Sequence, residues 1–232
     1  MNNVEIVGNG TISKIFINIS EFKNKCVIYA KGCSNSQNKV IEEFKRDYND
    51  LNNYLLKLRE NNNKPIFVYF STYSISDSSR NTNPYVVHKY NLENLIKQKY
   101  DKYIILRIPE IIAYPKRNNN ILNFLYYNLK EKKRIDIWSG QLRNLISIDN
   151  LAKITKELVN NYKSKTHSYF INKSFIEIDE IIQLFNDILV IDERFINKLY
   201  FKKNEFNMTD IDKIEVMINN DETKKQIKEY YG

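Results

Sequence analysis

Three side chains that together can move a proton lie within one short stretch of the sequence. Tyr85 and Lys89 are four residues apart in PYVVHK, and Thr72 ends the apolar run IFVYFST. On a helix, this spacing puts the phenol and the ammonium on one face, one turn apart. Because a neighbouring ammonium favours the phenolate, we expect Lys89 to lower the pKa of Tyr85 from its usual value of about 10. Tyr85 would then exchange a proton with a substrate oxygen that the Thr72 hydroxyl orients.

A glycine-rich turn follows the first apolar segment. Residues 4–13 read VEIVGNGTIS, with Gly8, Gly10 and Ser13 in the spacing GxGxxG/A and serine as the small third residue. The first glycine allows a tight turn, the second lets backbone approach a pyrophosphate, and the small third residue lets a helix pack on the strand. A helix beginning near Thr11 would offer free N–H groups to the phosphates. If the segment is a dinucleotide-binding turn, we expect the cofactor to contact Gly8, Asn9, Gly10, Thr11, Ile12 and Ser13. The alternative is an ordinary glycine turn without a ligand.

Apolar runs alternate with helix-type patterns along the chain. Nearly continuous apolar segments, typical of parallel strands buried on both faces, lie at residues 26–30, 66–70 and 103–108. Residues 40–60 carry apolar side chains at spacings of three and four, which predicts an amphipathic helix. Pro84 suits the first turn of the helix that carries Tyr85, expected to reach about Lys99. We expect later helices over 121–130, 174–189 and 210–231. Alternating strands and helices predict an α/β fold.

The order of these features resembles the short-chain dehydrogenase/reductase superfamily, and most closely its extended branch, the NAD-dependent epimerase/dehydratase family that acts on nucleotide sugars. Thr72, Tyr85 and Lys89 look like the catalytic triad of that family. The resemblance covers residues 4 to about 155. It implies a Rossmann-like doubly wound parallel sheet with a small C-terminal substrate-binding lobe. The expected core is 1–115 with a return strand near 143–155, and the expected lobe is 116–142 with 156–232.

Further site residues follow from the resemblance. Ala30, the last residue of the second strand, and Gly32 just after it would lie against NAD or NADP, and Lys89 would contact the nicotinamide ribose. A planar guanidinium suits the pyrophosphate of a nucleotide-sugar substrate, which is the role implied for Arg143. The residues expected to bind the substrate are Ser71, Tyr73, Asn118 and Arg143. A homodimer is left open, and surface-polysaccharide synthesis is the usual setting for such a relative.

The residues around Thr72 and the length of the N-terminal segment bear on the reaction and on the cofactor. The 4,6-dehydratases of the family typically follow the catalytic threonine with Asp and Glu, whereas this sequence has Tyr73 and Ser74, which argues against elimination. Keto-sugar reduction and epimerisation remain, with reduction ranked first. About a dozen residues separate Ser13 from Cys26, where the family has an additional strand, helix and strand for the adenosine half of the cofactor. NAD against NADP therefore stays open, as does a non-catalytic relative that binds a nucleotide or a partner.

The composition of the chain limits its possible partners, its location and its metal binding. The chain has 232 residues, a formal charge of +8 and a pI near 9.2, which favours anionic partners. The basic residues are spread out and do not cluster around aromatic side chains, so we expect no nucleic-acid partner. No apolar run approaches a membrane span and no signal-peptide pattern is seen, so we expect a cytoplasmic protein without a membrane partner. A metal site built from both cysteines and both histidines is disfavoured, because Cys26 lies inside a strand pattern, and no metal is expected.

Overall fold

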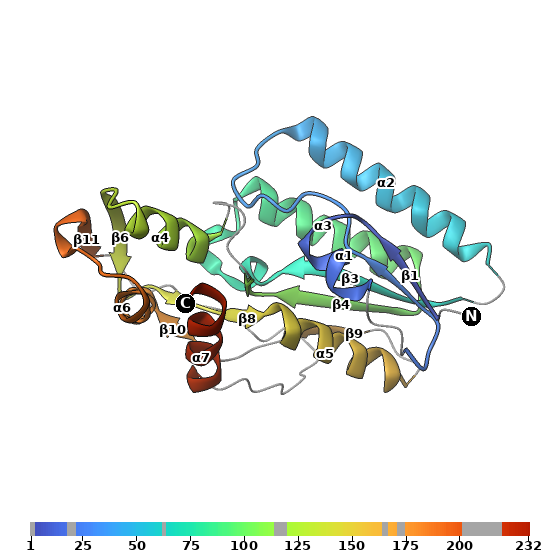
Figure 1. Ribbon diagram of the computed structural model, residues 1–232. Helices are drawn as coiled ribbons and strands as arrows, with labels where there is room; N and C mark the ends of the chain where they lie inside the picture. The colour runs from blue at the N-terminus through green and yellow to red at the C-terminus, as the bar shows by residue number, and fades with distance from the viewer. Residues whose placement is uncertain are drawn as a thin grey trace. The chain divides into compact units, whose positions relative to one another are not determined.

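The computed structural model describes residues 3–17, 22–61, 64–113, 120–163, 167–170, 175–200 and 220–232 (Figure 1). Its contacts divide the chain into two compact units. The first contains the described residues of Met1–Ile108 and Asp149–Ile171, and the second contains those of Pro109–Ile148, Asn172–Glu205 and Glu215–Gly232. Within the described part of the chain, no helix combines the length and the apolar character needed to cross a membrane.

The first unit is built on a five-stranded parallel sheet. In spatial order its strands are β1 (Val4–Val7), β2 (Cys26–Tyr29), β3 (Ile66–Thr72), β4 (Tyr103–Ile108) and β9 (His167–Phe170). All residues of β2 are buried, as are the first six of β3, because helices cover both faces of the sheet. The predicted α/β fold with a Rossmann-like parallel sheet is thus confirmed, and the strands lie close to their expected positions.

Helices pack on both faces of this sheet. On one face, α2 (Ile41–Arg59) and α3 (Pro84–Lys99) form a core with strand side chains such as Tyr29 and Phe67. On the other face, the Phe16 ring of α1 (Thr11–Phe16) packs 5.8 Å from the ring of Phe70. Figure 1 shows α5 (Ile148–Asn160) on the opposite side of the sheet from α2 and α3. Helices therefore cover both faces of the sheet.

The strands lie in the sheet in the order in which they occur in the sequence. The order β1-β2-β3-β4-β9 has no reversal, and β1 forms an edge of the described sheet. Among the described residues between β1 and β2, the six-residue α1 is the one regular element, and this connection is too short for the additional strands that the family resemblance implies on the adenosine side. The glycine turn after β1 therefore lies directly beside the end of β2.

The start of α3 is fixed by local sequence. Asn83 caps the helix, because its Oδ1 accepts hydrogen bonds from the backbone N–H groups of Tyr85 and Val86 at 3.0 and 3.3 Å. Pro84 occupies the first turn, where its missing N–H has no cost. The helix ends at Lys99 as predicted. Tyr85 is thereby held in the first turn, and Lys89 follows one turn later.

The second unit has its own core, which brings together its helices and short strands. The helices are α4 (Ile121–Lys130), α6 (Ile178–Ile188) and α7 (Asn220–Tyr231). The strands pair as β5 (Glu110–Ile112) with β8 (Leu145–Ser147), β6 (Ile135–Ser139) with β11 (Ile196–Tyr200), and β7 (Leu142–Arg143) with β10 (Ile176–Glu177). At the centre, the Tyr231 phenol donates to Asn123 Oδ1 at 2.6 Å.

Two features of the later chain differ from the sequence-based expectation. The helix expected from Ser174 begins at Ile178, because Ile176 and Glu177 pair with β7; residue 174 itself lies outside the described residues. The expected return strand near 143–155 is mostly the helix α5, and the contacts place Asp149–Ile171 in the first unit. β9 from this segment completes the parallel sheet, and it lies where the sequence SYFINKS, from His167 onward, predicts a strand.

Candidate active site

Thr72 and Tyr85 are brought together at the C-terminal end of β3. The Thr72 Oγ1 accepts the backbone N–H of Ser74 at 3.2 Å, which fixes the side chain at the start of a short 3₁₀ turn. The Thr72 hydroxyl also hydrogen-bonds to the Tyr85 phenol and favours its ionised form. Because its oxygen accepts from the backbone, the single hydrogen of this hydroxyl is the one directed at the phenol, and it can turn to a substrate oxygen when one is bound. The two side chains can therefore address one substrate oxygen together.

Lys89 lies near this pair but points its ammonium elsewhere. The Lys89 Nζ is buried and donates to Tyr69 Oη at 2.8 Å and to the Phe70 carbonyl at 3.2 Å. Burial raises the pKa of Tyr85 to about 12, against a lowering effect of the Thr72 hydrogen bond. The expectation that Lys89 lowers the pKa of Tyr85 is therefore wrong for this structure, because the ammonium is satisfied by β3 and the phenol is desolvated.

The charges around Lys89 come from α2, from the loop after β2 and from α3 itself. Burial lowers the pKa of Lys89, while Asp47, Cys33 and Glu93 oppose this shift. Burial also disfavours ionised Asp47, but hydrogen bonds from His88 and from the Cys33 N–H hold the pKa of this carboxyl below its usual value. A carboxylate that accepts such bonds stays charged. Asp47 thus provides a fixed negative charge close to Lys89.

The glycine turn has the conformation that its sequence predicts. Gly8 has a φ of +126°, and a Cβ there would lie 2.4 Å from the Ala30 carbonyl oxygen, so a side chain is excluded on both counts. Gly10 faces open space, with no atom within 4 Å of a Cβ built on it. Ser13 is fully buried, and its Oγ donates to the Gly10 carbonyl at 2.9 Å. The turn therefore leaves Gly10 accessible just after the end of β1. Asn9, Thr11 and Ile12 are the other residues of this turn.

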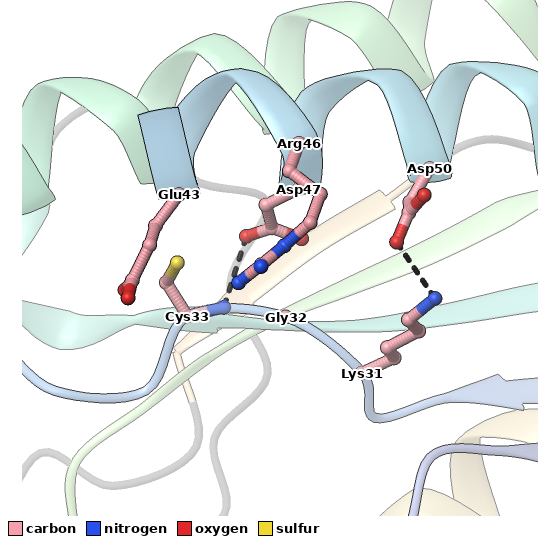
Figure 2. A pocket seen from close by; sticks show the side chains of 7 residues that line it. All are labelled: Lys31, Gly32, Cys33, Glu43, Arg46, Asp47 and Asp50. Atoms are coloured by element: carbon pink, nitrogen blue, oxygen red, sulfur yellow. Dashed lines mark hydrogen bonds and ion pairs between the residues drawn. The ribbon is translucent and has the colours of Figure 1, made fainter. Parts of the chain in front are cut away.

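Gly32 is held against α2. It has a φ of +118°, and a Cβ on it would lie 2.4 Å from Asp47 Oδ1. The next residue, Cys33, donates its backbone N–H to Asp47 Oδ2 at 3.0 Å. Figure 2 shows the small cavity beside this loop, of about 250 Å³, whose lining comes from the loop and from α2: Lys31, Gly32, Cys33, Glu43, Arg46, Asp47 and Asp50.

The residues expected to bind substrate are found in different surroundings. Ser71 is only 2% exposed, and its Oγ has no hydrogen-bond partner among the described residues. Tyr73 is buried in the 3₁₀ turn after Thr72. Arg143 belongs to the second unit, where its Nη2 donates to Gln141 Oε1 at 2.9 Å and its buried Nε has no partner in the described structure. Asn118 lies outside the described residues.

Arg107, on β4, has a structural role beside the site. Its Nε and Nη2 donate to the two carboxylate oxygens of Glu93 at 2.9 and 2.8 Å, and both side chains are buried. This two-point ion pair ties β4 to α3, the helix that carries Tyr85 and Lys89. Arg107 therefore supports the site and is not free to bind a ligand.

Sequence reasoning missed Asp47, Tyr69 and the pairing of Asp47 with His88. The buried side chains of α2 are Asp47, Leu51, Leu55 and Leu58. A carboxylate at the head of a leucine stripe is an unusual choice for a packed face and was an available signal. The position of Tyr69 beside Lys89 depends on the register of α3 on β3, which no local pattern encodes.

Solved structures of nucleotide-sugar enzymes share this fold. UDP-glucuronic acid 4-epimerase from Bacillus cereus, in complex with UDP-glucuronic acid and NAD, matches with a TM-score of 0.62 and 20% identity, over 84% of this chain and 66% of that chain. UDP-N-acetylglucosamine 4-epimerase from Methanobrevibacter ruminantium M1, in complex with UDP-N-acetylmuramic acid, matches with a TM-score of 0.67 and 15% identity, over 96% and 79%. The dTDP-glucose 4,6-dehydratase DesIV from Streptomyces venezuelae, with NAD bound, matches with a TM-score of 0.63 and 12% identity, over 78% and 64%.

These likenesses identify the fold. The chain has the Rossmann-like fold of the NAD-dependent epimerases and dehydratases, and it spans just under two thirds of two of the three structures described above. Protein-family models and curated proteins give no match. At such low identities, activity and ligands have to be argued from the residues of this chain.

Proposed function

We propose that this protein is an NAD(P)-dependent oxidoreductase or epimerase that acts on a nucleotide-linked sugar, with Tyr85 as the acid or base. The observation that carries the proposal is the hydrogen bond between Thr72 and Tyr85 at the end of β3, with Lys89 one helical turn away. The fold supports it, because the similar epimerases and dehydratase were solved with NAD or with a nucleotide sugar.

The residues of the glycine turn fit a dinucleotide. A pyrophosphate needs close approach to backbone, and Gly10 leaves the space that a Cβ would fill. Gly8 and Ser13 hold the turn in place through the contacts with Ala30 and with the Gly10 carbonyl. When bound, the reduced cofactor supplies a hydride to the carbonyl carbon of the sugar.

The protonation state of Tyr85 favours reduction of a keto sugar. With its pKa raised by burial to about 12, the phenol is protonated at neutral pH and serves as a proton donor. As the carbonyl oxygen gains charge, Tyr85 gives it a proton while Thr72 holds the same oxygen by a hydrogen bond. Two of the three N–H bonds of Lys89 are used by Tyr69 and Phe70, which leaves the third for a ribose hydroxyl of the cofactor.

The second unit is proposed to bind the nucleotide sugar, with Arg143 on its pyrophosphate and Asn118 as a further contact. The buried Nε of Arg143 has no partner in the described structure, and a guanidinium with an unused donor favours an oxyanion ligand. In the first unit, the unpartnered Ser71 hydroxyl beside Thr72 is a donor for the sugar.

The alternative is a non-catalytic relative that binds a nucleotide or a partner protein. It is favoured by one observation, the short connection from β1 to β2, which leaves no described strand on the adenosine side of the glycine turn. A thermal-shift panel with NAD, NADH, NADP, NADPH and UDP-, GDP- and dTDP-sugars separates the two ideas. Stabilisation by a dinucleotide supports the enzyme, whereas stabilisation by sugar nucleotides alone supports the non-catalytic alternative.

A further inference from the structure

Three side chains that are good metal ligands meet beside the cavity of Figure 2. Cys33 comes from the loop after β2, Asp47 from α2 and His88 from α3. One ligand atom of each lies within 4.8 Å of the other two, and His88 Nε2 is 2.9 Å from Asp47 Oδ2. We infer that these residues form a binding site for a single Zn²⁺ ion, a property that does not depend on the proposed function.

The donor set suits zinc better than magnesium or calcium. A thiolate, an imidazole and a carboxylate are common zinc ligands, whereas Mg²⁺ and Ca²⁺ select oxygen. Zinc–ligand bonds of about 2.0–2.3 Å put tetrahedral ligand atoms roughly 3.5 Å apart. The ligand atoms, which lie within 4.8 Å of one another, would therefore have to move about 1 Å closer together, and the ion would then replace the direct contact between His88 and Asp47.

The surroundings orient two of the ligands. The Phe44 ring stacks on His88 with centroids 4.6 Å apart and planes at 23°, which fixes the plane of the imidazole. The Asn38 Nδ2 lies 3.8 Å from Cys33 Sγ, to which it donates, and 2.7 Å from Glu43 Oε2. A donor directed at the sulfur stabilises a thiolate, as do the outer partners of metal ligands in general.

The cavity provides an entry path and a fourth ligand position. Its lining includes Cys33 and Asp47, and Figure 2 shows Glu43 on the same side of α2 as the Cys33 sulfur. Either the Glu43 carboxylate or a water molecule can complete four-coordination, as in zinc sites with three protein ligands.

The charge balance of the site favours a divalent cation. Binding releases the thiol proton to solvent, and the resulting thiolate with the Asp47 carboxylate neutralises the ion. Among the nearby cations, Lys31 is paired with Asp50 at 2.7 Å. The Lys89 ammonium is directed to Tyr69 and Phe70. Arg46 also lines the cavity, and its positive charge repels an entering metal ion most directly.

The test is calorimetric titration of tag-free, chelator-treated protein with Zn²⁺, together with absorption spectra of the Co²⁺ form. We expect one ion per chain and a sulfur-to-cobalt charge-transfer band. Cys33→Ser should abolish that band, and Cys33→Ser and His88→Gln should each weaken Zn²⁺ binding by more than about 100-fold. Asn38→Ala, which changes only an outer partner, should weaken it by about 10-fold.

The chain offers matched controls, because it contains only one other cysteine and one other histidine. Cys26→Ala and His167→Gln should bind Zn²⁺ as the unmodified protein does. Absence of stoichiometric binding, or a charge-transfer band that survives Cys33→Ser, overturns the inference. If Cys33→Ser does not fold, the cobalt spectrum of the unmodified protein decides by itself whether sulfur coordinates the ion, and His88→Gln tests the imidazole.

Discussion

Replacing Tyr69 by phenylalanine tests the structural reason why Lys89 does not address Tyr85. Tyr69 is fully buried on β3, and its phenol accepts a hydrogen bond from Lys89 Nζ at 2.8 Å. A hydrogen bond to a charged group contributes about 1.5–3 kcal/mol, and here the ammonium would keep only the Phe70 carbonyl. For a chain of this size, that loss lowers the melting temperature by about 3–12 °C.

Urea unfolding of Tyr69→Phe and of Tyr29→Phe measures the effect. Tyr29 is the matched control, because it pairs with Tyr69 on the neighbouring strand, is equally buried, and has no described hydrogen bond to a charged group. In a Lys89→Met background the Tyr69→Phe change should cost less than about 1 kcal/mol, since the ammonium is gone. Equal losses for Tyr69→Phe and Tyr29→Phe, or the same loss in both backgrounds, would refute the reasoning.

Three further predictions concern α3, the glycine turn and the phenol. Glu93→Gln should lower the free energy of unfolding by about 3–5 kcal/mol, because it leaves Arg107 buried without its partner; a loss under about 1 kcal/mol in urea unfolding would contradict this. Gly10→Val should abolish dinucleotide binding by calorimetry while circular dichroism stays native, whereas Gly8→Val should destabilise the fold itself; unchanged affinity of Gly10→Val would mean that the turn is only a turn. Because burial raises the pKa of Tyr85 to about 12, the unfolded chain releases this proton first, and stability falls as pH rises from about 10 towards 12. When the pH rises from about 9 to 11, the free energy of unfolding of Tyr85→Phe should fall by about 1 kcal/mol less than that of the unmodified protein. Equal decreases for the two proteins would count against a buried, protonated phenol.

Local patterns were enough to predict the elements that carry the site. Buried parallel strands are continuous apolar runs, so β3 and β4 lie where the sequence placed them. Pro84 predicted the first turn of α3, which the structure shows with Asn83 as its cap, and the spacing of the glycines predicted the turn after β1. In each case a few neighbouring residues determine the conformation.

What the sequence could not predict depends on long-range contacts. The direction of the Lys89 ammonium is set by Tyr69, twenty residues earlier in the chain. The cluster of Cys33, Asp47 and His88 requires the loop after β2, α2 and α3 to be placed against one another. The late start of α6 reflects pairing of Ile176 and Glu177 with β7, which outweighs helix propensity at the helix start. None of these contacts leaves a periodic signal.

The turnover of Tyr85→Phe, measured with the cofactor and sugar nucleotide that stabilise the protein in the thermal-shift panel, tests the central claim most directly. The substitution keeps the ring in its buried place and removes the hydroxyl that we propose as the proton donor. We predict that ligand affinities by calorimetry stay within about threefold and that kcat falls by about 100-fold or more. Turnover of Tyr85→Phe at the rate of the unmodified protein would contradict the account.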